Sequence, residues 1–260
     1  PWAIRLAAGA AVAPDDVILS PDAARRAGLT GTVVFPVGNL APEGSVVKAT
    51  SIDPSVVGED QVFRHRGPAR VFTDERDAIL AVKGGSERPI RPGEVIVLIG
   101  AGPSGTGMQE TAQITFALKY LPWGKHVALV TDGRFSGVST GACIGHVGPE
   151  ALHGGPIGRV RDGDLIEIVI DRTGLTGSID LVGAAGQPLE RDACAALLAE
   201  RGAHPGLAPH GALPEDTRLW AALQRASGGT WAGCVYDVDR IVAALEAGVA
   251  ALDAPPGGTS

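Results

Sequence analysis

One stretch of the sequence constrains the fold more than any other, because it alternates apolar strands with a helix. Residues 94–99 are apolar after Glu94, rich in β-branched side chains and bounded by glycines, which predicts a buried strand. A helix is predicted over residues 107–120, and a second strand over residues 126–131. Strands that alternate with helices favour an α/β core.

Shorter segments extend this pattern on both sides. Further strands are predicted at residues 31–36, 46–49, 69–72, 165–170 and 177–182, and helices at residues 75–82, 190–201, 215–227 and 238–247. Residues 132–158 contain eight glycines and little periodicity, which predicts a long ordered loop. Asp162-Gly163-Asp164 is typical of a turn. Since the final segments are all helical, the sequence predicts a mixed α/β fold with a helical C-terminal appendage.

The charge balance and the cysteines exclude several classes of protein. The 260 residues include 29 acidic and 22 basic ones, a net charge of −7, which disfavours binding to nucleic acid. No apolar run approaches the roughly 20 residues of a membrane span. The cysteines Cys143, Cys194 and Cys234 form no C-x-x-C pair, so reduced thiols in the cytoplasm are expected. Because the chain begins at Pro1 without an initiator methionine, we expect a piece of a longer protein.

A glycine-rich segment offers one interpretation of the function. Residues 100–105 match G-x-G-x-x-G between a predicted strand and a predicted helix, the context of a dinucleotide-binding loop in an oxidoreductase. Asp132 lies 27 positions after Gly105, however, against a usual spacing of about 20. Glu110 would also place negative charge near a diphosphate. A plain glycine-rich turn between strand and helix therefore stays an equal alternative.

The segment after the second strand offers another interpretation. Residues 131–137 (TDGRFSG) follow a buried strand, and ligands of α/β sheets bind at such strand ends. Ser136 lies between Phe135 and Gly137 and needs a base, a metal or a positive charge to react. His146 and His153 are candidates for that help. A Ser-Gly pair is more often a simple turn, and a loop histidine is more often structural.

Five sequence blocks in a fixed order then identify a family. They are residues 102–110 (GPSGTGMQE), 131–137 (TDGRFSG), 145–151 (GHVGPEA), 154–157 (GGPI) and 162–164 (DGD). Together with residues 38–42 (GNLAP), Lys48 and residues 67–72 (GPARVF), this series resembles the C-terminal domain of the dihydroxy-acid dehydratase and phosphogluconate dehydratase superfamily. Over residues 135–146, 216–220 and 228–231 the chain is similar to the D-xylonate dehydratase branch in particular.

The resemblance implies a fold and a domain organisation. Residues 1–185 are expected to form a barrel-like β core with flanking helices, similar to the swivelling domain of aconitase-like enzymes. Residues 186–260 are expected to form a helical extension packed on it. The family's N-terminal domain, which holds an iron–sulfur cluster, is absent from this chain.

The resemblance also implies a reaction and roles for named residues. Members of the family are hydro-lyases that convert a 2,3-dihydroxy acid, such as the sugar acid D-xylonate, to a 2-keto-3-deoxy acid. Ser136 carries over as the general base that removes the C2 proton, which as an alkoxide requires an electropositive site. Glu110 carries over as a ligand of Mg²⁺, which prefers oxygen ligands. Ser104, Ser139 and Thr140 are expected to contact the substrate.

The expected cofactors and partners follow from the same resemblance. They are Mg²⁺, an iron–sulfur cluster of the 2Fe–2S type on the missing N-terminal domain, that domain itself, and a second copy of the enzyme in a homo-oligomer. No nucleic acid and no membrane is expected. A non-catalytic swivelling or oligomerisation domain is the third hypothesis, beside the dehydratase and the dinucleotide-binding oxidoreductase.

Overall fold

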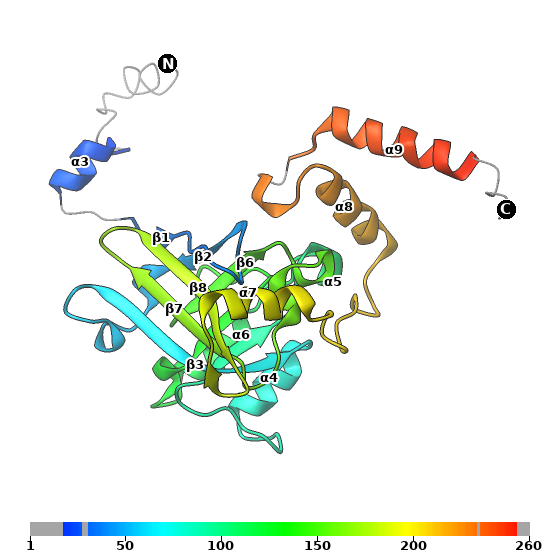
Figure 1. The fold of residues 1–260 in the computed structure, drawn as a ribbon. Coiled ribbons are helices and arrows are strands. Elements are labelled where there is room, and N and C mark those ends of the chain that lie inside the picture. Colours follow the sequence, from blue (N-terminus) through cyan, green and yellow to red (C-terminus); the bar gives the residue numbers. More distant parts are fainter. Residues whose placement is uncertain (1–17, 28–30, 233–234, 254–260) are drawn as a thin grey trace. The chain divides into compact units, whose positions relative to one another are not determined.

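The computed structural model describes residues 18–27, 31–232 and 235–253 (Figure 1). The chain divides into two units, residues 1–32 and residues 33–260. The described part of the first unit contains α3 (Pro21–Arg26). The hydroxyl of Ser20 accepts a hydrogen bond from the Ala23 amide at 3.2 Å, which satisfies one of the free N–H groups at the start of this helix. Cys234 lies outside the described residues.

The second unit is built on one curled sheet of nine strands. They are β1 (Val33–Val34), β2 (Gly44–Lys48), β3 (Val62–Phe72), β4 (Val95–Leu98), β5 (Ala128–Thr131), β6 (Cys143–Gly148), β7 (Leu165–Asp171), β8 (Thr176–Ala184) and β9 (Gln187–Pro188). The strand order is β1-β2-β6-β5-β4-β3-β7-β8-β9. The four central strands, β6, β5, β4 and β3, run parallel, and the outer pairs are antiparallel.

The two edges of this sheet are joined through the segment after β1. Val37 pairs with Ser178 of β8, and its amide donates to the Gly177 carbonyl at 3.2 Å. The Ile179 amide donates back to the Val37 carbonyl at 3.1 Å. Closing a sheet on itself removes its exposed edges. The predicted barrel-like β core is therefore confirmed.

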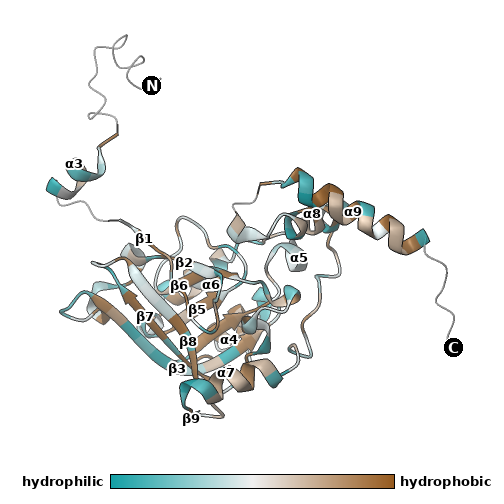
Figure 2. Cartoon of the chain, turned by 45° about the horizontal axis from the view of Figure 1, so that its top comes forward, coloured by the Kyte–Doolittle hydropathy of each residue, from teal (hydrophilic) through white to brown (hydrophobic). Residues whose placement is uncertain are grey.

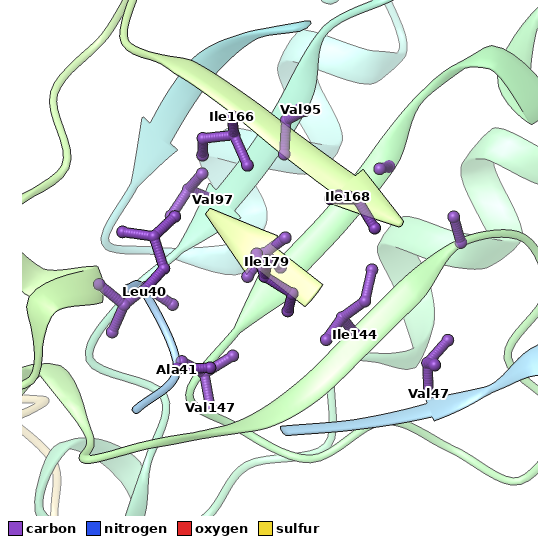
Figure 3. Packing of buried hydrophobic residues seen from close by; sticks show 14 of the residues in the cluster. Leu40, Ala41, Val47, Val95, Val97, Ile144, Val147, Ile166, Ile168 and Ile179 are labelled. Carbon is purple, nitrogen blue, oxygen red and sulfur yellow. The ribbon is translucent and has the colours of Figure 1, made fainter. Parts of the chain in front are cut away.

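The two middle parallel strands, β4 and β5, are buried on both faces, which explains their nearly continuous apolar sequence. Successive side chains of a strand alternate between faces, so Val95 and Val97 enter the cluster inside the barrel. Ile96 and Leu98 enter a second cluster outside it, against α4 and α6. Figure 3 shows part of the inner cluster, where Val97 lies among side chains from other strands, including Ile166 and Ile179.

Seven α-helices are described in the chain, of which six belong to the second unit. These six are α4 (Glu75–Val82), α5 (Pro103–Thr106), α6 (Ala112–Lys119), α7 (Arg191–Glu200), α8 (Glu215–Ala226) and α9 (Val238–Asp253). Short 3-10 helices are η1 (Ala49–Ser51), η2 (Pro54–Val56), η3 (Gly124–His126), η4 (Ala151–His153), η5 (Pro156–Arg159) and η6 (Thr230–Ala232). Cys194 and Leu198 of α7 join the inner cluster. None of the described helices has both the length and the apolar character of a membrane span.

The last helix differs from the rest in leaving its apolar side chains uncovered. Figure 2 shows apolar residues along α9. The exposed ones are Val238, Val242, Leu245, Val249 and Leu252, spaced alternately four and three residues apart. This spacing places them on one side of the helix.

Several predicted elements are confirmed, and two predictions are wrong. The helix at residues 75–82 is present with the predicted bounds, and Asp74 caps it by accepting from the Arg76 amide at 2.7 Å. The loop predicted over residues 132–158 is wrong, because it contains β6, η4 and part of η5. The start of the helix predicted over residues 107–120 is also wrong, because the helix is present as α6 but begins at Ala112. Gly107 and Met108 adopt left-handed backbone angles (φ of 70° and 68°), which separate α5 from α6.

Candidate active site at the carboxyl end of the parallel strands

Two of the predicted sequence blocks meet at one end of the barrel. β4 and β5 are parallel neighbours with Leu98 paired to Thr131, so the segments after them start at the same level. The Arg134 amide donates to the Gln109 carbonyl at 3.3 Å, and the Thr111 amide donates to the Arg134 carbonyl at 2.9 Å. These bonds place Glu110 directly beside the segment that carries Ser136.

A fully buried carboxylate fastens these segments to a third one. Asp132 accepts backbone N–H groups from Gly100 at 3.1 Å, from Ala101 at 2.9 Å and from Ala151 at 2.9 Å. Burial raises the pKa of Asp132 to about 6, because desolvation outweighs the three donors, and the nearby Glu150 adds to the rise. Asp132 therefore joins the loops after β4, β5 and β6.

The glycine-rich loop packs against itself, and its amides donate to buried carboxylates. The Ser104 amide donates to both carboxylate oxygens of Glu150, at 3.2 and 3.0 Å. A Cβ atom on Gly105 would lie 1.8 Å from the Gly100 carbonyl oxygen, so glycine is needed there for the loop's own packing. The amides of Gly100, Ala101 and Ser104, which a diphosphate would require, are already donated to protein carboxylates.

Ser136 lies in a tight turn and is half-buried. Its amide donates to the hydroxyl of Ser139 at 3.2 Å, and the Ser139 amide donates to the Ser136 carbonyl at 3.0 Å. The Val138 amide donates to the Ser136 hydroxyl oxygen at 3.4 Å. A donor aimed at this oxygen favours its negatively charged form.

A cation reaches the same turn from a distant part of the chain. Lys48, at the end of β2, donates a hydrogen bond from Nζ to the Gly137 carbonyl. The Gly141 amide donates to the Ser51 carbonyl at 2.9 Å, which fixes the other end of the turn against η1. The Lys48 ammonium group therefore lies on the turn that carries Ser136. From the sequence, Lys48 is only one of the residues that resemble the family, and no role is assigned to it.

The two histidines that the sequence suggested as helpers of Ser136 have other partners. His146 packs edge to face against Phe135 with ring centroids 6.0 Å apart, and burial lowers its pKa. His153 contacts Ser104 and Glu150. Among the described residues no hydrogen bond joins either imidazole to Ser136.

Comparisons with known proteins show the family of the chain. The family model described as "Dihydroxy-acid/6-phosphogluconate dehydratase C-terminal" matches residues 17–196. The chain belongs to the dihydroxy-acid/6-phosphogluconate dehydratase family. The chain is 60% identical to the D-xylonate dehydratase YagF of Escherichia coli over 241 residues, which are 93% of this chain and 36% of that protein. It is 56% identical to YjhG, a D-xylonate dehydratase of the same organism, over 89% of this chain and 35% of that protein.

Relatives with another substrate name match a smaller part. The dihydroxy-acid dehydratase of Caldanaerobacter subterraneus is 49% identical over 142 residues, which are 54% of this chain and 24% of that protein. The chain therefore spans about a third of the length of the D-xylonate dehydratases it matches, and less of the dihydroxy-acid dehydratases.

The oxygen donors at this candidate site fit one part of a magnesium site. The Glu110 carboxylate is 38% exposed and pairs with the Arg134 guanidinium at 3.3 Å. Arg134 also donates from Nε to the Met108 carbonyl at 3.0 Å, which fixes the guanidinium near the carboxylate. Within the described ranges no three His, Cys, Asp or Glu side chains gather in metal-binding geometry. Glu110 therefore fits as one ligand of such an ion, without two further His, Cys, Asp or Glu ligands among the described residues.

The described cysteines of this dehydratase domain do not fit an iron–sulfur cluster. Cys143 and Cys194 are both buried, Cys143 in the outer cluster and Cys194 in the inner one. Burial raises the pKa of the Cys143 thiol to about 12, which keeps it protonated, whereas a cluster ligand is a thiolate. We therefore derive no step through a cluster from these residues.

The other two predicted substrate contacts lie beside Ser136. Ser139 is 2% exposed, and its hydroxyl accepts from the Ser136 amide, so part of its bonding capacity holds the turn. Thr140 is half-buried and lines a hollow of about 520 Å³ between η1, η2 and α6. Whether either side chain contacts substrate remains a prediction.

Proposed function

We propose that this chain is the C-terminal domain of a hydro-lyase that dehydrates a sugar acid such as D-xylonate to a 2-keto-3-deoxy acid, with Ser136 as general base. The observation that carries the proposal is the extent of the similarity. The D-xylonate dehydratase alignment spans 241 residues, so it must continue past residue 196 into the C-terminal helices, where the family model ends. The match to a dihydroxy-acid dehydratase spans 142 residues, 54% of this chain.

The site supports a base that works as an alkoxide. The hydroxyl of Ser136 has the Val138 amide directed at its oxygen, and the Lys48 ammonium lies on the adjacent peptide group. Both interactions stabilise negative charge on the oxygen and reduce the cost of losing its proton. The alkoxide then takes the C2 proton of the substrate, and the charge passes to the carboxylate end of the substrate as an enediolate.

The enediolate requires a second source of positive charge. Mg²⁺, when bound, stabilises this charge as a Lewis acid. Glu110 would hold the ion from this chain, and Arg134 keeps the carboxylate in place beside the Ser136 turn. The remaining magnesium ligands and an iron–sulfur cluster would be held, in this proposal, by the N-terminal domain of the same cytoplasmic enzyme. We also propose that the complete enzyme is a symmetric homo-oligomer.

The test uses the complete enzyme that contains this chain, assayed for 2-keto acid formation from D-xylonate. We expect Ser136→Ala to lower kcat by at least about a thousandfold, within the range for loss of a general base. Ser86→Ala is the matched control, because Ser86 lies on the loop that leads into β4, at the opposite end of the parallel strands. A wild-type enzyme that leaves D-xylonate unchanged would contradict the substrate, and an active Ser136→Ala variant would contradict the base.

A further inference from the structure

A chain of three hydrogen-bonded side chains lies at the edge of this site. The Ser104 hydroxyl is 2.7 Å from Nε2 of His153, and Nδ1 of His153 is 3.0 Å from Oε1 of Glu150. The Glu150 side chain is 6% exposed and the His153 side chain 21%. Because Glu150 also accepts the Ser104 amide, the chain of hydrogen bonds returns to the residue at which it starts, and this fixes its geometry.

For an ionised Glu150 and a neutral His153, the order of the partners sets the direction of each hydrogen bond. An ionised Glu150 only accepts, so Nδ1 of His153 carries the hydrogen. In a neutral imidazole Nε2 is then an acceptor, and the Ser104 hydroxyl donates to it. The remaining capacity of the Ser104 oxygen is therefore acceptor capacity, which suits a ligand that presents a hydroxyl group.

This arrangement resembles a nucleophilic serine with its base, but the surrounding backbone does not complete such a site. A nucleophile of that type needs free N–H groups to stabilise an oxyanion. The amides of Ser104, Gly105 and Thr106 donate to Glu150 or to the Gly102 carbonyl instead. The side chains are thus arranged for hydrogen bonding to a ligand rather than for attack on one.

Glu150 and His153, together with Pro103 next to Ser104, line a hollow that the C-terminal extension completes. Its volume is about 320 Å³, and its lining includes Glu150, His153, Ala221, Gln224, Arg225 and Trp231. Ala221, Gln224 and Arg225 lie on α8, and Trp231 lies on η6. The extension that supplies this wall is the part of the chain that the D-xylonate dehydratase alignment includes and the family model does not.

We propose that Ser104 accepts a hydrogen bond from a substrate hydroxyl beyond C3, and that His153 and Glu150 are positioning residues that hold Ser104 as an acceptor. This inference rests on the proposed function and names the group that distinguishes a sugar acid from an alkyl dihydroxy acid. D-xylonate carries hydroxyl groups on C4 and C5. In 2,3-dihydroxypentanoate the same carbon chain carries hydrogen there, so the pair of substrates isolates the proposed contact.

The experiment compares kcat/KM for these two substrates in the complete enzyme. We expect Ser104→Ala to lower the ratio of D-xylonate to 2,3-dihydroxypentanoate about tenfold, the effect of one lost hydrogen bond, mainly through a higher KM for D-xylonate. Ser104→Thr keeps the hydroxyl, and we expect it to retain the ratio. An unchanged ratio in Ser104→Ala, or an equal loss for both substrates, would overturn the assignment.

A double-mutant cycle tests the positioning role. His153→Phe removes both of its hydrogen bonds, and we expect the ratio to fall in the same direction as in Ser104→Ala. If His153 acts through Ser104, the same change in the Ser104→Ala background lowers the ratio no further. Additive losses would contradict the positioning role. A wild-type enzyme inactive on D-xylonate but active on 2,3-dihydroxypentanoate would instead contradict the proposed substrate, so the two failures are distinguishable.

Discussion

The polar residues at the open end of the barrel form two layers that differ in how their hydrogen-bonding capacity is used. In the buried layer, Asp132 and Glu150 accept backbone N–H groups from the loops around them. In the outer layer, Lys48, Glu110 and Ser136 are more exposed and make few bonds. Carboxylates at the same ends of the strands therefore have different roles. Those whose acceptor capacity is used by backbone amides hold the loops together, and those with unused acceptor capacity remain available for ligands.

The largest expected effect of this difference is on stability in the buried layer. Asp132→Asn places an NH₂ group among three N–H donors and leaves at least one of them without an acceptor. We expect the free energy of unfolding of this chain to fall by about 3 kcal/mol. Urea denaturation measures it. Asp171→Asn is the matched control, because Asp171 also accepts two backbone amides but lies on a surface turn. Equal losses in both variants would remove the distinction between the layers.

The next expected effect is on catalysis in the outer layer. Lys48→Met removes the charge beside the Ser136 turn and keeps the length of the side chain. We expect kcat of the complete enzyme on D-xylonate to fall about tenfold or more, since a charged partner contributes at least about 1.5 kcal/mol, with the urea midpoint little changed. Lys125→Met, which loses only an exposed bond to Ser55, is the control. A loss of stability without a change in kcat would show that Lys48 has a structural role, like the residues of the buried layer.

A smaller effect is expected for the carboxylate of the outer layer. Glu110→Gln keeps the shape of the side chain but removes its charge, so we expect the Mg²⁺ concentration for half-maximal activity to rise about tenfold, as for loss of one charged ligand contact. Activity as a function of added Mg²⁺ is the measurement. Glu215→Gln, which breaks a surface ion pair with Arg218, is the control. An unchanged magnesium dependence would exclude Glu110 as a ligand.

The smallest expected effect is a pH dependence of the buried layer. The pKa of Asp132 is raised to about 6 in the folded chain, above the unfolded value, so the folded state binds the additional proton. Its contribution to stability therefore grows as the pH falls from 7 toward 5, by about 1 kcal/mol. The difference in unfolding free energy between wild type and Asp132→Asn, measured at both pH values, isolates this contribution from other groups. A difference that shrinks on acidification would show the opposite sign.

The elements that sequence analysis predicted correctly have local signals. The helix after Asp74 has a capping residue at its start and glycines at its end, and the alternation of β7 and β8 needs no distant partner to recognise. The sequence does not predict β6, because the glycines in this segment are atypical of a strand. A Cβ on Gly145 would lie 2.6 Å from the Phe135 ring, so that glycine is set by tertiary packing rather than by local propensity.

The site divides in the same way. Ser136 and Glu110 were predicted because they lie within sequence blocks that resemble a family. The role of Lys48 could not be predicted, because it lies 89 positions before the residue it contacts and β2 reaches the turn only through the barrel. The bonds of His153 to Ser104 and Glu150 could not be predicted from the sequence either, since they depend on how the loops after β4 and β6 pack against each other.

The three amides bound to Asp132 have a consequence for anyone who wishes to change the substrate of such an enzyme. Gly100, Ala101 and Ala151 come from two separate loops, and Asp132 itself comes from the loop that carries Ser136. If a single loop were replaced by the corresponding loop of a relative, its amides and the carboxylate that accepts them would no longer match in position. The three loops therefore form one transferable unit, and grafting experiments should move them together, with Asp132 as the common joint.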